Sequence, residues 1–157
     1  RPSGRGRTAW DRLHLTPQQH MALFEWLRQH PDVTTGDSYF ILNALGEPLH
    51  GFNTCAAGTA TCCITPTGDV YPCAFLLGTD QVAGNLRERS LREIWEGSAL
   101  LAAFRETPVD GCTRCPSFRV CGGGCRAVSY FVSGVLFGRD PECLAAPQPV
   151  GAEGRLP

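Results

Sequence analysis

The amino-acid sequence predicts a small α+β protein that is organised around cysteine ligands. Two short strand-like segments flank a Pro-Thr-Gly turn, several segments carry helix-capping signals, and nine cysteines fall within residues 55–143. A chain of 157 residues can bury one ordinary hydrophobic core, or two small cores held together by metal. We therefore expect a β-hairpin and short helices packed around metal sites.

Helix signals occur at four places along the chain. Thr16-Pro17-Gln18-Gln19 is a capping box with proline at the first helical position, and it predicts a helix that ends before Pro31. Ser90-Leu91-Arg92-Glu93 is a second capping box, and Ser98 is expected to cap the following helix. A last helix is expected over 127–132, ending at Gly134. The side chains expected to face the core are Leu23, Phe24, Leu27, Leu100, Leu101 and Phe104.

Strand signals are fewer. Residues 39–42 are expected to form a short strand after a turn at Gly36-Asp37. Residues 59–64 and 70–73 flank a turn and predict a hairpin, which would bring Cys62 or Cys63 near Cys73 because antiparallel partners lie about 5 Å apart. Neighbouring strand residues point to opposite faces, so only one of these two thiols can share a face with Cys73.

Composition and charge exclude several classes of function. A formal net charge of −1 and a pI near 6.5 do not favour a nucleic-acid or membrane-surface partner. There is neither an apolar run of membrane-spanning length nor a secretory signal, which favours a cytoplasmic location. An odd number of cysteines without such a signal favours metal ligands over disulfides. All four histidines precede Cys55, so all-thiolate sites are expected.

The densest motif is Cys-x2-Cys-x5-Cys-x3-Cys, from Cys112 to Cys125. Thiolates at this density are typical of soft metals and iron–sulfur clusters. The glycines at 122–124 would let the backbone wrap closely around a ligand and point N–H groups at it. Eight ligands would fill two four-thiolate sites, which favours two [4Fe–4S] clusters. A structural zinc module remains an alternative, because Cys112-x2-Cys115 has the spacing of a zinc knuckle.

The complete pattern resembles the SPASM domain, the auxiliary-cluster module at the C-terminus of many radical S-adenosylmethionine (AdoMet) enzymes. Its elements are Cys55-x12-Gly68-x4-Cys73, the dense motif and a final Cys143. Other segments resemble the mycofactocin radical SAM maturases, and these are Arg1–Gly6, Thr35–Ser38, Gly68–Tyr71, Ala83–Asn85 and Asp140–Cys143.

The resemblance implies two interleaved ligand sets. Auxiliary cluster I would be held by Cys55, Cys73, Cys125 and, as we predict, Cys62, with Cys63 as the alternative. Auxiliary cluster II would be held by Cys112, Cys115, Cys121 and Cys143. Because each set draws on separate segments, cluster binding and folding are expected to be coupled.

The resemblance also implies a domain organisation. Residues 1–50 would be the remnant of a barrel exit with a bridging helix and strand, residues 51–145 the SPASM domain, and residues 146–157 a disordered tail. The sequence has no Cys-x3-Cys-x2-Cys motif, through which these enzymes bind their catalytic cluster. AdoMet and a third [4Fe–4S] cluster would therefore belong to an N-terminal barrel, and this portion alone is expected to be inactive.

The function implied is maturation of a ribosomal precursor peptide. The family oxidatively decarboxylates a C-terminal tyrosine and cross-links it to the neighbouring valine, while a small peptide-binding chaperone presents the precursor. Three alternatives stay open: a maturase of the same class with another peptide or protein substrate, a zinc-binding structural module, and a free-standing ferredoxin-like electron carrier.

Overall fold

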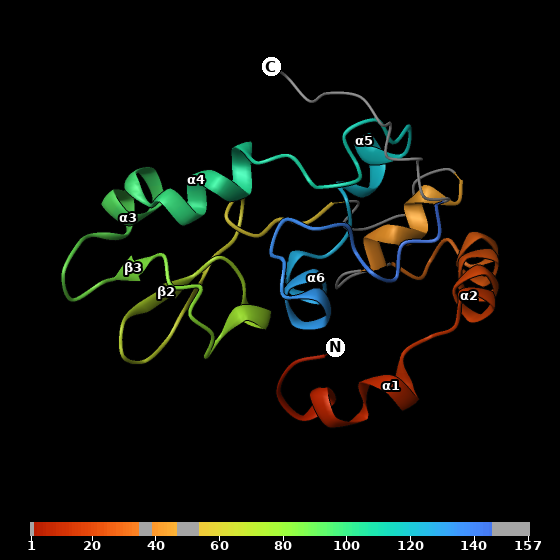
Figure 1. Cartoon of the computed structure of the whole chain (residues 1–157), viewed down its shortest axis with the longest axis horizontal. Helices are drawn as coiled ribbons and strands as arrows, with labels where there is room; N and C mark the ends of the chain where they lie inside the picture. Colours follow the sequence, from red (N-terminus) through yellow and green to blue (C-terminus); the bar gives the residue numbers. More distant parts are fainter. Residues whose placement is uncertain (1, 35–38, 47–53, 146–157) are drawn as a thin grey trace, which may run out of the picture.

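Short helices and one small antiparallel sheet make up the computed structural model, which describes residues 2–34, 39–46 and 54–145. Helices α3 and α4 lie beside the sheet at one end of the molecule, α6 lies near the middle, and α2 lies at the other end (Figure 1). This mixture of helices and a small sheet agrees with the predicted α+β class. The predicted turn at Gly36-Asp37 and the predicted disordered tail lie outside the described residues.

The N-terminal helices follow their local signals. A 3-10 helix, η1 (Gly4–Ala9), leads into α1 (Trp10–Leu13) and then α2 (Pro17–Gln29). The predicted capping box is present, because Gln19 N donates to Thr16 Oγ1 at 3.2 Å and Thr16 N donates to Gln19 Oε1 at 2.8 Å. Phe24 and Leu27 are buried against Leu42, so the core-facing side of this helix is confirmed.

The strand expected at residues 39–42 is wrong. Tyr39–Ala44 form a 3-10 helix, η2, in which four consecutive residues are buried. A strand between a core and solvent buries alternate residues, whereas this segment is enclosed by α2 on one side and α5 (Phe118–Cys121) on another. A short apolar run does not distinguish a strand from a buried helical turn, which explains the error.

The predicted hairpin is confirmed and is extended by a third strand. The sheet order is β1 (Cys63–Ile64), β2 (Asp69–Tyr71) and β3 (Gly84–Asn85), all antiparallel. The hairpin turn is closed by Thr65 N donating to Asp69 O at 2.9 Å. The third strand is only two residues long, too short for an alternating pattern that the sequence could reveal.

Helices α3 (Leu91–Gly97) and α4 (Ala99–Glu106) hold the sheet in place. The Ser90–Glu93 capping box is confirmed. Ser98 occupies the N-cap position of α4, but its side chain makes no capping hydrogen bond. Ile94 and Leu101, both fully buried, pack with Val70 and Ala83 of the sheet region. Burying side chains of this size contributes roughly 1.5–3 kcal/mol each, so this small core fixes the position of β2.

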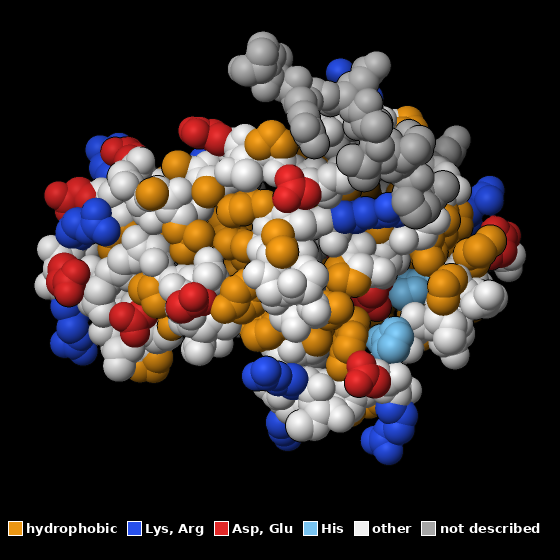
Figure 2. Space-filling model, viewed as in Figure 1, with side chains coloured by type: hydrophobic (Ala, Val, Ile, Leu, Met, Phe, Trp, Pro, Cys, Tyr) orange, Lys and Arg blue, Asp and Glu red, His pale blue; other side chains and the backbone are white. Residues whose placement is uncertain are grey.

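The last helix, α6 (Arg126–Ser133), ends at Gly134 with a φ of 75°, as predicted. Its Ala127 and Val128 belong to the largest core, together with Phe104 and Leu76. Hydrophobic side chains run across the middle of the face shown in Figure 2, while charged side chains gather at its edges. No helix within the described residues has the length and apolarity needed to cross a membrane.

Candidate metal centre

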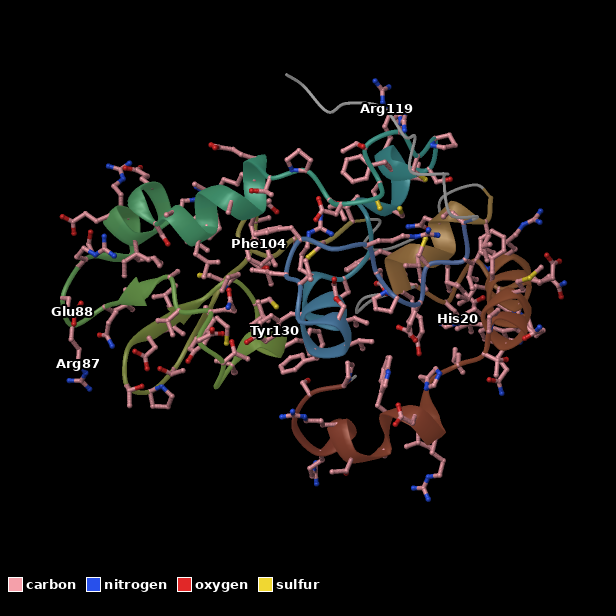
Figure 3. The ribbon with its side chains drawn as sticks, in the orientation of Figure 1. His20, Arg87, Glu88, Phe104, Arg119 and Tyr130 are labelled. Carbon is pink, nitrogen blue, oxygen red and sulfur yellow. The ribbon has the colours of Figure 1, made fainter. Side chains whose placement is uncertain are left out.

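The nine cysteines are all free thiols, and most of them gather at two cavities. Sulfur atoms are visible beside α5 and below it in Figure 3. The first cavity is lined by the four cysteines that the resemblance assigns to cluster II, namely Cys112, Cys115, Cys121 and Cys143. The structure therefore brings this predicted set together.

Successive turns bring three of these cysteines to the first cavity. Cys115 N donates to Cys112 O at 3.0 Å, and Phe118 N donates to Cys115 O at 3.1 Å. Helix α5 follows these turns and ends at Cys121. Cys143 comes from a separate turn, which is closed by its own N–H donating to Asp140 O at 3.0 Å.

Electrostatics show how closely these thiols are grouped. The pKa of Cys112 is raised to about 11, mainly by burial and in addition by negative charge at the neighbouring Cys143, Cys121 and Cys115. Burial also raises the pKa of Cys121, while a hydrogen bond from Gly123 N–H to its sulfur at 3.4 Å acts in the opposite direction. A soft metal would have to displace protons here, since thiolates are the binding form.

The second cavity, of about 160 Å³, is lined by Cys55, Cys73 and Cys125. It lies between the hairpin and the start of α6, with Phe40 and Phe75 on its wall. Burial is the main cause of the raised pKa of Cys73, and negative charge at Cys55 and Cys63 adds to it. Three of the four ligands expected for cluster I are thus close together.

Cys63 begins β1, Cys62 immediately precedes it, and the two side chains pack in different cores. Cys63 pairs with Tyr71, so its side chain shares a face with Tyr71 and, two residues further on, with Cys73. Cys63 packs in the same core as Cys55, Cys73 and Cys125. Cys62 packs instead with Val70, Ile94 and Leu101 in the small core. Cys63, rather than the expected Cys62, therefore lies on the side of the other cysteines expected for cluster I.

The three glycines of the dense motif have a steric role. Gly122, Gly123 and Gly124 all have positive φ values, of 60°, 81° and 81°. A Cβ on Gly124 would lie 2.3 Å from Cβ of Asp140, which leaves no room for a side chain. Gly123 N–H donates to the Cys121 sulfur, in line with the expectation that this backbone points N–H groups at the ligand side.

Two residues beside the cysteines were not predicted as part of a site. Arg139 lines the first cavity, and its Nη2 donates to Cys143 Sγ at 3.4 Å. Asp140 is only 2% exposed, and its Oδ2 accepts a hydrogen bond from Cys125 N. Asp140 belongs to a segment that carried the family resemblance, whereas no sequence signal distinguishes Arg139 from the other arginines.

Neither cysteine group is arranged as a site for a single metal ion. Within the described part of the chain, no three His, Cys, Asp or Glu side chains stand close enough together to hold one metal ion. The cysteines nevertheless gather at both cavities, and each group draws on separate segments of the sequence. All-thiolate sets of this kind suit iron–sulfur clusters.

Comparison with known proteins gives a family match over part of the chain. Residues 55–116 match the SPASM family, an iron–sulfur cluster-binding domain. The match includes Cys55 and Cys73 of one set and Cys112 and Cys115 of the other.

The chain is also similar to several curated proteins. It is 44% identical over 149 residues to the mycofactocin maturase MftC of Mycolicibacterium smegmatis, an alignment that covers 92% of this chain and 38% of that protein. It is 35% identical over 104 residues to the AdoMet-dependent heme synthase of Methanosarcina barkeri, covering 62% and 29%. It is 35% identical over 101 residues to the PqqA peptide cyclase of Methylocella silvestris, covering 59% and 26%. The chain spans less than two fifths of the length of each of these relatives.

Proposed function

We propose that this chain, whose residues 55–116 match the SPASM family, is the auxiliary-cluster portion of a radical SAM peptide maturase of the mycofactocin type. The observation that carries the proposal is the division of seven motif cysteines between two cavities, four in one and three in the other. The 44% identity to a mycofactocin maturase, over 92% of this chain, supports the choice of this type within the SPASM class.

The ligands of cluster II in this proposal are Cys112, Cys115, Cys121 and Cys143. Their common cavity and the mutual effect of their charges on the pKa of Cys112 support the assignment. The turns around Cys112 and Cys115 and the short helix that ends at Cys121 hold three of the sulfurs. The fourth sulfur arrives from the Asp140–Cys143 turn, so binding a cluster would join the dense motif to the C-terminal segment.

The ligands of cluster I are Cys55, Cys73 and Cys125, with the hairpin supplying the fourth. Cys62 is the fourth ligand predicted from the sequence, with Cys63 as the alternative, but the register of β1 and the packing both favour Cys63. Cys63 therefore replaces Cys62 in the proposal. This set would join the segment before the hairpin, both hairpin strands and the start of α6.

A cluster at either cavity would supply one-electron transfer. The residues of this chain would bind it through thiolates, bury it and set its potential through hydrogen bonds to sulfur. Electrons would pass between these clusters and an AdoMet-binding barrel outside this chain. There a precursor peptide, presented by a small peptide-binding chaperone, would be oxidatively decarboxylated and cross-linked between tyrosine and valine.

Metal analysis tests the cluster proposal directly. Anaerobic reconstitution should yield roughly eight irons per chain and a brown colour that dithionite bleaches. Cys62→Ala serves as a matched control, because it removes the thiol next to Cys63 and belongs to neither proposed set. Stoichiometric zinc with no uptake of iron would replace the cluster proposal by the structural zinc alternative.

The substrate is tested separately, in the full-length protein that contains this chain. Incubation with AdoMet, a reductant and a mycofactocin-type precursor peptide should lower the mass of the peptide by one carbon dioxide and two hydrogens, because the proposed decarboxylation is oxidative. A full-length protein that cleaves AdoMet but leaves this peptide unchanged would assign it to a maturase with another substrate.

A further inference from the structure

Arg139 stands out among the arginines because it contacts a sulfur. Its Nη2 donates to Cys143 Sγ at 3.4 Å, from the segment that immediately precedes the Asp140–Cys143 turn. The side chain is half-buried, and it lines the same cavity as all four cysteines proposed for cluster II. Among the described residues that line this cavity, Arg139 is the only one with a formal charge at neutral pH.

The charge of Arg139 acts on the thiols around it. The hydrogen bond to Cys143 is the largest cause of the raised pKa of Arg139, and negative charge at Cys143, Cys112 and Cys115 adds to it. In return, the guanidinium opposes the burial that raises the pKa of Cys112. An arginine side chain does not lose its proton in proteins, so the guanidinium is a fixed positive charge beside Cys143 and favours negative charge at this site.

Reduction of a bound cluster would increase that negative charge. One electron from an external low-potential reductant makes the cluster and its thiolates one unit more negative, with no bond broken and no proton required. A fixed positive charge and an N–H donor at a ligand sulfur stabilise the reduced form more than the oxidised form. Partial burial limits the screening of this interaction by salt.

We propose that Arg139 is a positioning residue that raises the reduction potential of auxiliary cluster II through its contact with Cys143. The inference rests on the proposed function, because it requires a cluster in this cavity. It goes further by giving Arg139 a role in setting the potential of cluster II, which it would make a better electron acceptor than the thiolates alone would make it.

The other cavity has an arginine with a different role. Arg126 lines the cavity of cluster I, but its Nη2 donates to Gly122 O at 2.8 Å and its Nη1 to Gly124 O at 3.4 Å. These bonds fix the glycine loop through its carbonyl groups. Changing Arg139 should therefore alter one cluster and leave the other as an internal reference.

The test is a redox titration of the reconstituted chain, followed by electron paramagnetic resonance with parallel iron analysis. Arg139→Gln removes the charge, Arg139→Lys keeps it, and Arg119→Gln is the matched control. Arg119 is exposed on α5 and points away from the molecule in Figure 3. All three variants should retain roughly the eight irons of two cubane clusters.

In Arg139→Gln, one of two titrating components should show at least a tenfold lower ratio of reduced to oxidised cluster at a fixed potential. For a one-electron couple, tenfold corresponds to about 59 mV. The other component, and both components of Arg119→Gln, should match the unmodified protein. Arg139→Lys should recover most of the ratio. Unchanged titrations in an Arg139→Gln protein with full iron content would overturn the inference while leaving the proposed function intact.

Two further outcomes also decide the question. If Arg139→Gln loses half of its iron, Arg139→Lys becomes the decisive variant. Full iron content and a redox titration that matches the unmodified protein would support the role of the charge. Loss of iron in Arg139→Lys as well would assign Arg139 to folding and overturn the inference. If the unmodified chain binds no iron at all, the proposed function fails and the inference fails with it.

Discussion

The backbone N–H of Cys125 donates to Asp140 Oδ2 over 2.7 Å. The other carboxylate oxygen of Asp140 accepts from Glu142 N at 2.9 Å, and its backbone carbonyl accepts from Cys143 N at 3.0 Å. One buried residue therefore connects a proposed ligand of cluster I with a proposed ligand of cluster II. The close approach of Gly124 to this side chain holds the two loops together.

This arrangement predicts that Asp140→Asn will destabilise the protein and weaken both clusters. Asparagine has one side-chain oxygen for the two N–H donors that Asp140 satisfies, and a buried unpaired donor costs about 1–3 kcal/mol. We expect a lower free energy of unfolding and a loss of iron that affects both clusters. Asp110→Asn, an equal change of charge at an exposed position, is the control. Loss confined to cluster I would show that Asp140 does not link the sites.

The two adjacent cysteines predict opposite results for equal substitutions. Cys63→Ala should change the spectrum of one reduced cluster or remove its iron, because Cys63 shares the core of Cys55 and Cys73. Cys62→Ala should leave both cluster spectra unchanged, because this thiol packs against Ile94 and Leu101 on the other face. Electron paramagnetic resonance and iron content provide the measurement. The reverse pattern would mean that the strand register differs by one residue.

These two cysteines also show which features of the fold can be predicted from the sequence and which cannot. Capping boxes at Thr16 and Ser90 were predicted because each depends on residues three apart in sequence. The hairpin was predicted from its turn. The choice between Cys62 and Cys63 depends instead on how β2 packs against Ile94 and Leu101, which lie far from the hairpin in the sequence. Strand β1 has only two residues, too few for an alternating pattern that would reveal which cysteine faces which core.

Arg139 and residues 39–44 illustrate the same limit. The apolar run Phe40-Ile41-Leu42 is compatible with either a strand or a helical turn, and its contacts with α2 and α5 decide between them. The contact of Arg139 with Cys143 depends on the turn at Asp140. By contrast, the resemblance covers all seven motif cysteines, and the structure places four of them at one cavity and three at the other.

The raised thiol pKa values predict how the metal-free chain responds to pH. Burial raises the folded-state pKa of Cys112 to about 11 from an ordinary value near 9. The folded state therefore holds this proton more tightly than the unfolded state, and the associated stability is fully present below pH 9. It is lost as pH rises towards 11. Denaturant unfolding of the metal-free protein should show this decline, and Cys112→Ala should make it shallower. An unchanged pH dependence in Cys112→Ala would assign the decline to other thiols.

The last prediction is that this chain, reconstituted with iron and sulfide, will not cleave AdoMet. Reductive cleavage requires a cluster with one iron that is free to bind the amino and carboxylate groups of AdoMet. In the proposed assignment every iron of both clusters has a cysteine ligand from this chain. Positioning contributes many orders of magnitude to rate, up to effective molarities of about 10⁸ M, and the AdoMet-binding barrel is proposed to lie outside this chain. We therefore expect no 5′-deoxyadenosine from the reduced chain with AdoMet, measured by chromatography and mass spectrometry. The full-length protein, treated identically, should form it.

The Cys63→Ala variant adds a sharper comparison, because it would open one iron of cluster I and should still form no product without the barrel. Catalytic formation of 5′-deoxyadenosine by the 157 residues alone would contradict both the ligand assignment and the division of labour between this chain and the barrel.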